Sequence, residues 1–103
     1  MSGQRFADVI RRQLDLFERE EADLISDCVE TERAYDAADR EDAEERYSEY
    51  LDLVETGTEL LAGLRDAFAS TIEDEEAAEE YEDAFNRTVV KRLPRFAVQI
   101  DDF

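Results

Sequence analysis

The chain has 103 residues, with 30 acidic side chains against 12 basic ones and a formal net charge of −18. It contains no histidine and one cysteine, which excludes an imidazole base, a histidine-ligated metal, a disulfide within the chain and a thiolate zinc cluster. Leu, Ile, Val and Phe make up 25 residues, about 24% of the chain, above the roughly 20% below which a highly charged chain is expected to be disordered. These numbers predict one small domain with a modest core.

The first predicted element is a long helix over residues 4–38. Its apolar residues follow one another mainly in steps of three, four or seven, which places them on one face of a helix. They are Phe6, Ile10, Leu14, Phe17, Leu24, Cys28, Tyr35 and Ala38. Such spacing is typical of a coiled-coil seam, and the same count places Glu21 on that seam. Because a straight helix drifts off a strict seven-residue repeat, we expect Glu21 at the rim of the interior and Cys28 within it.

The second predicted helix follows a short connection and carries its own apolar stripe. Asp39 is a candidate N-cap, since its carboxylate can accept a hydrogen bond from a free backbone N–H of the first turn. The stripe consists of Tyr47, Tyr50, Val54, Gly57, Leu61, Leu64, Phe68 and Thr71. A short connection makes the two helices antiparallel neighbours, with Tyr35 next to Tyr47 in the interior. At Gly57 the helix either continues or breaks.

A shorter third helix is predicted to end before Pro94, because a residue preceding proline avoids the helical conformation. One capping box at its start pairs Ser70 with Glu73. The alternative box, one residue later, pairs Thr71 with Asp74. About 19 residues span roughly 28 Å, so this helix covers half of the hairpin and leaves an apolar groove over the other half.

Residues 94–103 are predicted to form a C-terminal arm, and residues 1–93 the helical domain. Phe96, Val98 and Ile100 alternate with smaller or polar residues, and this period of two predicts an extended segment. With no strand to pair with, the arm packs on its own chain, packs on a second copy or frays. The sequence therefore predicts an all-α fold: a long antiparallel helical hairpin, a shorter third helix and an extended C-terminal arm.

The acidic residues are concentrated in the middle of the chain and dispersed among apolar positions. Residues 23–83 carry 23 acids against four arginines, and one of the 12 basic residues of the chain is a lysine. In this composition the chain resembles the acid-rich, lysine-poor proteins of haloarchaea that accumulate salt. The resemblance implies a salt-adapted protein, because at molar salt the Debye length falls to about 3 Å and self-repulsion is screened.

Carboxylates three residues apart on a helix can present their oxygens to Mg²⁺ from one face. The pairs of interest are Glu18 with Glu21, and Glu80 with Asp83. A helix-borne Glu-x-x-Glu with a Glu-x-x-Asp is similar to the metal signature of the all-α nucleoside triphosphate pyrophosphohydrolases. That resemblance implies a Mg²⁺-dependent nucleotide hydrolase. On all other grounds we expect no catalytic residue and no cofactor.

The end of the third helix is locally positive. These cations either form a phosphate or nucleic-acid patch, or complement the helix dipole and pair with acids on neighbouring helices. The second interpretation is favoured, because nucleic acid would have to approach past 23 acids. Together with the arm they give the candidate interaction residues Arg87, Lys91, Arg92, Arg95, Phe96, Val98 and Ile100.

The function favoured by the sequence is that of a small non-enzymatic interaction or adaptor protein whose partner the sequence does not identify. We expect a homodimer, because the half-covered hairpin leaves apolar surface open. The alternatives are the nucleotide hydrolase and a transcription-associated factor that uses the basic end of the third helix. No apolar run reaches the length of a membrane span and no signal-peptide core is apparent, so we expect a cytoplasmic protein without membrane contacts.

Overall fold

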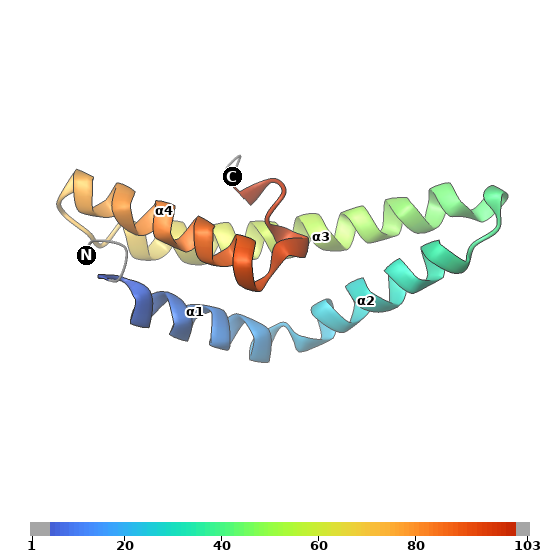
Figure 1. The fold of residues 1–103 in the computed structure, drawn as a ribbon, viewed down its shortest axis with the longest axis horizontal. Coiled ribbons are helices and arrows are strands. Elements are labelled where there is room, and N and C mark those ends of the chain that lie inside the picture. Colours follow the sequence, from blue (N-terminus) through green and yellow to red (C-terminus); the bar gives the residue numbers. More distant parts are fainter. Residues whose placement is uncertain (1–4, 101–103) are drawn as a thin grey trace.

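A computed structural model describes residues 5–100, and all regular structure in that range is helical (Figure 1). The elements are α1 (Ala7–Glu20), α2 (Ala22–Ala37), α3 (Arg40–Ala69), α4 (Glu75–Arg92) and the 3₁₀ helix η2 (Pro94–Phe96). The all-α prediction is confirmed for these residues. The expected helix start at residue 4 and the last three residues of the arm lie outside the described range.

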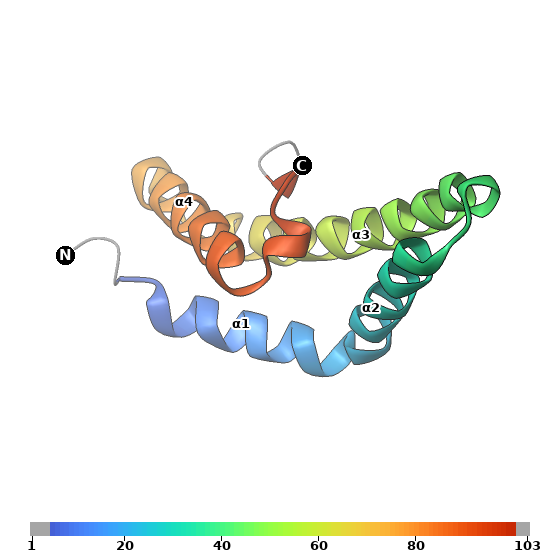
Figure 2. The same ribbon diagram turned by 45° about the vertical axis from the view of Figure 1, so that its right-hand side comes forward.

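The helical hairpin is formed by α2 and α3, which run antiparallel from a tight connection at Ala38 and Asp39 (Figures 1 and 2). The predicted pairing of Tyr35 with Tyr47 is confirmed, with ring centroids 5.2 Å apart. Asp39 occupies the N-cap position of α3, but its side chain makes no capping hydrogen bond. The helix α3 continues through Gly57 without a break and, at 30 residues, is about 45 Å long.

The single first helix predicted over residues 4–38 is wrong, because the chain bends at Glu21 between α1 and α2 (Figure 2). Glu21 has backbone angles of φ −108° and ψ 28°, outside the α-helical region. A continuous helix that kept the strict seven-residue repeat would carry this carboxylate to the buried face that holds Leu14 and Phe17, where its desolvation is costly. The bend leaves Glu21 half-buried and turns α1 toward α4 while α2 stays on α3.

The helix α4 begins one turn later than either predicted capping box. Its N-cap is Asp74, whose carboxylate accepts a hydrogen bond from the Ala77 N–H at 3.2 Å. The hydroxyls of Ser70 and Thr71 instead donate to the carbonyls of Ala67 and Phe68 in the last turn of α3. As predicted, α4 is the shorter helix, with 18 residues against the 30 of α3, and it ends before proline.

The C-terminal arm is not extended, which corrects the prediction from its period of two. After Leu93 the chain forms η2 and then a series of turns up to Ile100. Phe96 and Ile100 are both buried, whereas Val98 between them is 85% exposed. Phe96 and Ile100 are four residues apart, and helical turns bring residues at this interval to the same side of the chain. Strand alternation would have placed Val98 on that side as well. We call residues 93–100 the C-terminal segment; it packs against α3 and α4.

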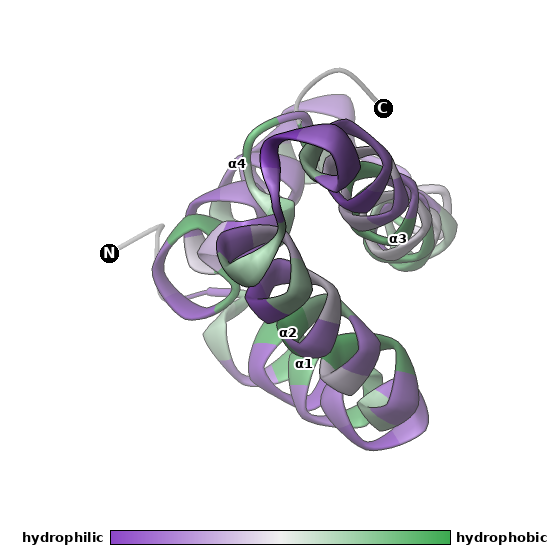
Figure 3. Ribbon diagram, turned by 90° about the vertical axis from the view of Figure 1, so that its right-hand side faces the viewer, coloured by the Kyte–Doolittle hydropathy of each residue, from purple (hydrophilic) through white to green (hydrophobic). Residues whose placement is uncertain are grey.

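The core lies where α1, α3, α4 and the C-terminal segment meet. Its buried apolar residues are Ile10, Leu14, Phe17, Cys28, Leu61, Ala62, Ala69, Ala77, Tyr81, Ala84, Phe85, Val89, Phe96 and Ile100. Cys28 is the one member from α2 among the described residues, so the core thins out toward the α2–α3 turn. Along all helices, hydrophobic stretches alternate with hydrophilic ones (Figure 3).

The interior expected from the sequence is confirmed at Cys28 and wrong at Tyr35 and Tyr47. Cys28 is buried as expected, and this burial raises the pKa of its thiol. Tyr81 is also fully buried. Tyr35 and Tyr47 stack on each other but stay partly exposed, because α4 does not extend over the end of the hairpin that carries them. Within residues 5–100, no helix is both long and apolar enough to cross a bilayer.

Candidate interaction site

The C-terminal segment is seated in a notch of α3 made by Gly57. A Cβ atom on this glycine would lie 2.3 Å from Cε1 of Phe96, so the aromatic ring occupies the space of a side chain. On its other side the Phe96 ring meets Phe17 of α1 edge-on, with centroids 5.8 Å apart. Gly57, where the sequence left open whether the helix breaks, is therefore a contact point between α3 and the C-terminal segment.

Two polar side chains of α3 hold the backbone of this segment. The hydroxyl of Thr58 lies 3.3 Å from the Phe96 carbonyl and 2.9 Å from the Val54 carbonyl. Arg65, which is 5% exposed, donates from Nη1 to the Ile100 carbonyl at 2.9 Å. Buried side chains that satisfy backbone carbonyls stabilise one conformation of an otherwise irregular segment.

Arg65 is not among the residues predicted from the sequence, although its position in the chain carries a signal. Arg65 follows Leu61 by four residues, so it lies on the same apolar stripe of the helix as its buried neighbour. Its guanidinium also donates to Asn86 at 3.0 Å and pairs with Asp66 at 2.8 Å. An arginine on a buried stripe indicates carbonyl or carboxylate partners nearby, and the C-terminal segment supplies one of them.

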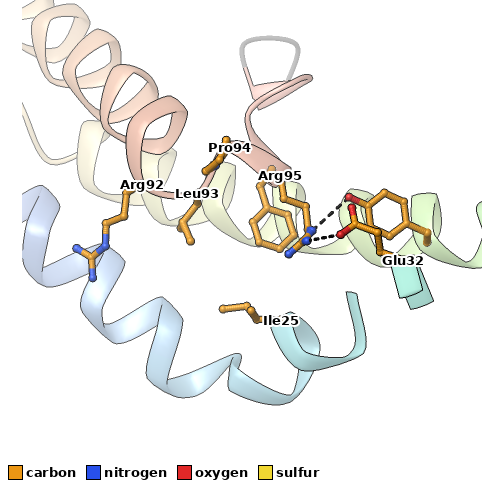
Figure 4. A pocket seen from close by; sticks show the side chains of 8 residues that line it. Ile25, Glu32, Arg92, Leu93, Pro94 and Arg95 are labelled. Carbon is orange, nitrogen blue, oxygen red and sulfur yellow. Dashed lines mark hydrogen bonds and ion pairs between the residues drawn. The ribbon is translucent and has the colours of Figure 1, made fainter. Parts of the chain in front are cut away.

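Two of the four predicted basic interaction residues are engaged within the chain. Arg95 donates to the Tyr50 hydroxyl at 3.2 Å and to Glu32 at 3.1 Å (Figure 4). Arg92 points away from this pair, toward α1, where it binds Asp15 and Glu18 (Figure 4). These contacts agree with the favoured interpretation, in which the cations pair with acids on neighbouring helices.

The ion pair of Arg92 with Asp15 and Glu18 connects the end of α4 to α1. The Arg92 Nε lies 2.7 Å from the Glu18 carboxylate. Hydrogen bonding from the same guanidinium holds the pKa of the Asp15 carboxyl below its usual value. A charge-assisted contact of this kind orients the two helices, although its exposure to water limits its contribution to stability.

The four candidate metal ligands have different surroundings. Glu18 accepts from Arg92, and Glu21 lies half-buried at the bend between α1 and α2. Glu80 faces Arg5 across 3.9 Å, and its Oε2 atom is buried without a hydrogen bond, while Asp83 is exposed. Within the described part of the chain, no three Asp, Glu or Cys side chains converge as a metal site would require.

The other two basic candidates, Arg87 and Lys91, are exposed on α4. They border a cavity of about 310 Å³ between α4 and α1, together with Arg11 and Thr88. Val90 lies beside them on the helix and is 54% exposed. The surface of α4 at this point is thus basic, with one apolar side chain among the cations.

An apolar groove of about 340 Å³ runs between α3 and the C-terminal segment. Its lining consists of Tyr47, Tyr50, Leu51, Val54, Glu55, Thr58, Arg95, Val98 and Gln99. Tyr47 is 46% exposed and Leu51 45%. The sequence predicted an open groove on this half of the hairpin, but it did not indicate Leu51, which lies off the predicted stripe. Of the predicted interaction residues, Arg95 and Val98 contribute to the groove, whereas Phe96 and Ile100 are buried in the core.

Family models, curated proteins and solved structures were each compared with this chain, and none matches it. Its function is therefore argued from its own surfaces. Among the surfaces that combine exposed apolar side chains with charge are the apolar groove and the basic surface of α4.

Proposed function

We propose that the protein is a small non-enzymatic interaction or adaptor protein that binds its partner through the apolar groove. The observation that carries this proposal is the exposure of Tyr47, Leu51 and Val98 around a single groove. Clustered apolar side chains on a monomer mark interaction surfaces, because their burial contributes about 25 cal/mol per Å². A surface that is otherwise rich in carboxylates makes this cluster conspicuous.

The groove is supported by contacts that restrict its shape. One wall is the helix α3, and the other is the C-terminal segment, which Thr58, Arg65 and Arg95 hold by hydrogen bonds. Because these walls are ordered before a partner arrives, little conformational entropy remains to be lost on binding. A preformed groove suits a binding protein.

The acid-rich composition of the chain supports an environment of high salt. We infer a salt-adapted protein of the cytoplasm of a halophilic cell, as the carboxylate-rich surface indicates. Apolar contacts in the groove do not weaken when salt screens exposed charges, so they suit binding at molar salt. The homodimer expected from the sequence could be held together by such apolar contacts.

For each of the two alternative functions, some of the side chains that would bind the ligand already take part in contacts within the chain. A Mg²⁺-dependent hydrolase would have to draw Glu18 away from Arg92, its hydrogen-bond donor at 2.7 Å. A nucleic-acid-binding factor could use Arg87 and Lys91 of α4, since Arg92 and Arg95 already face carboxylates. The adaptor function requires no rearrangement of these contacts.

Site-specific photo-crosslinking in cells tests the proposed function. A photoreactive residue in place of Leu51 should give a discrete crosslinked adduct, and the added change Tyr47→Asp should reduce its yield. The matched control is the same residue at Leu60, which is 41% exposed. Nine residues separate the two positions, so they lie on opposite faces of α3 at about 100° per residue. No adduct at position 51, or equal adducts at both positions, would overturn the proposal.

A further inference from the structure

We propose that the occupant of the apolar groove is a second copy of this chain, which enters the groove with the basic face of α4. The basic face is defined by Arg87, Val90 and Lys91. This inference rests on the proposed function, since it names the partner for the same groove.

The basic face combines cations with an exposed apolar side chain. Val90 and Lys91 follow Arg87 by three and four residues, and so flank it on one face of α4. All three are exposed. Residues 84–100 contain four basic side chains and no acid, whereas the chain as a whole has a net charge of −18. This face can therefore approach a negative surface that repels the rest of the molecule.

The surface of α3 around the groove has the opposite charge. The lining of the groove holds one acid, Glu55, and one cation, Arg95, which already pairs with a carboxylate of α2 at 3.1 Å. Residues 40–59 of α3 carry eight acids against two arginines, for a net charge of −6. Glu55 lines the groove one turn after Leu51, and Glu44 precedes Leu51 by seven residues, about two turns, on the same face. Both carboxylates are exposed.

Each of the two surfaces has an apolar side chain next to charged ones, and the charges on the two surfaces have opposite signs. With Val90 of one copy against Leu51 of the other, Arg87 and Lys91 lie toward the carboxylates Glu44 and Glu55. In a two-fold dimer this contact forms twice, because each copy offers one groove and one basic face. Opposite charges at the rim set partner choice and register, while the apolar centre supplies the contact that salt does not screen.

A charge exchange tests this proposal. The variant Arg87→Glu/Lys91→Glu makes the basic face acidic, and the variant Glu44→Lys/Glu55→Lys makes the groove basic. Masses are measured by sedimentation equilibrium at about 0.15 M and about 1 M KCl, with helicity checked by circular dichroism at each salt concentration. Wild-type protein should dimerise at both salt concentrations. At about 0.15 M KCl each variant alone should associate at least about tenfold more weakly, and at about 1 M the loss should shrink because the rim charges are screened. An equimolar mixture of the two variants should restore the dimer, since the exchanged charges attract again.

A matched pair of single substitutions tests the apolar centre. Leu51→Asp should weaken the dimer at least about tenfold at either salt concentration, whereas Leu60→Asp on the opposite face should leave it unchanged. A wild-type protein that stays monomeric at millimolar concentration, or a variant mixture that stays monomeric, would overturn the inference. If a photoreactive residue at position 51 then still crosslinks to another protein in cells, the proposed function stands, and the proposal that a second copy occupies the groove is wrong. If it crosslinks to nothing, both are wrong.

Discussion

Gly57 occupies the middle of a 30-residue helix, where glycine costs about 1 kcal/mol relative to alanine. Its benefit lies outside the helix, because the Phe96 ring occupies the space that a Cβ would need. Gly63 lies six residues later in the same helix and has no atom within 4 Å of its built Cβ. The two glycines thus have the same local cost and different surroundings.

We predict opposite effects for alanine at these two positions. Gly57→Ala should lower the free energy of unfolding by about 1–3 kcal/mol, because the added methyl displaces the Phe96 ring from a packed site. Gly63→Ala should raise it by up to about 1 kcal/mol through helix propensity alone. Urea unfolding followed by circular dichroism measures both. Equal stabilisation by the two substitutions would show that the ring moves away without cost.

Tyr81 is the buried tyrosine among the four of the chain, and its hydroxyl donates to Gln13 at 2.9 Å. Burial disfavours the phenolate and raises the pKa of Tyr81 to about 12. In the unfolded chain the same phenol ionises near pH 10. The folded state therefore keeps a proton that the unfolded state releases.

The pH dependence of stability follows from this difference. The contribution of Tyr81 is fully present below about pH 10 and is lost as the pH rises to about 12, up to about 3 kcal/mol in total. In the Tyr81→Phe variant this decline in the free energy of unfolding with rising pH should be absent. Tyr47→Phe, at a partly exposed position, should retain it. Unfolding curves at pH 9 to 12 that are parallel for both variants would contradict the assignment.

At the scale of elements, the C-terminal segment joins parts of the fold that have few other contacts. Phe96 touches α1 through Phe17 and α3 through Gly57, and Ile100 is bound through its carbonyl to Arg65. The segment therefore completes the core and also forms one wall of the apolar groove. Its stability and the shape of the groove are linked.

Side chains of this segment should differ sharply in their effect on folding. Phe96→Ala removes a fully buried ring and should lower the free energy of unfolding by about 3–5 kcal/mol. Val98→Ala changes an exposed side chain and should stay within about 0.5 kcal/mol at micromolar protein. Thermal unfolding of both variants measures the difference. Similar melting temperatures would mean that the segment does not contribute to the folded core.

At the scale of the whole molecule, the charge of −18 is carried by a slender structure measuring 52 × 24 × 21 Å. Most carboxylates lie on the outer faces of helices, and 12 basic side chains are too few to pair with 30 acidic ones. Repulsion among them opposes the compact state at low ionic strength. Salt acts on this repulsion directly through screening.

We predict that helicity and melting temperature rise as KCl is increased from about 0.1 M to about 2 M, as the Debye length falls from about 10 Å to below 3 Å. Circular dichroism at 222 nm measures the change. A variant with Glu41, Glu45 and Glu49 changed to Gln should respond less to salt, because fewer like charges remain on α3. A flat response in the wild-type protein would contradict salt adaptation.

The repeating positions of apolar residues were sufficient to predict helical structure, the α2–α3 pairing at Tyr35 and Tyr47, and the shorter α4, but not the division of the first helix into α1 and α2. These features depend on local propensity and on a period that can be read along one chain. The same period could not show the bend at Glu21, because the cost of burying one carboxylate depends on what packs against it.

The candidate site was visible in part. Composition and helix lengths predicted an open apolar groove, and the end of α4 was recognisably basic. The roles of Gly57 and Arg65 came from the tertiary structure, since both act on residues more than 30 positions away. Alternation at Phe96, Val98 and Ile100 predicted an extended arm, but without a neighbouring strand the segment satisfies its backbone through turns and the side chains of α3. The sequence by itself therefore determined the helices and the charge, while only the tertiary structure decided which surfaces are covered and which remain open for a partner.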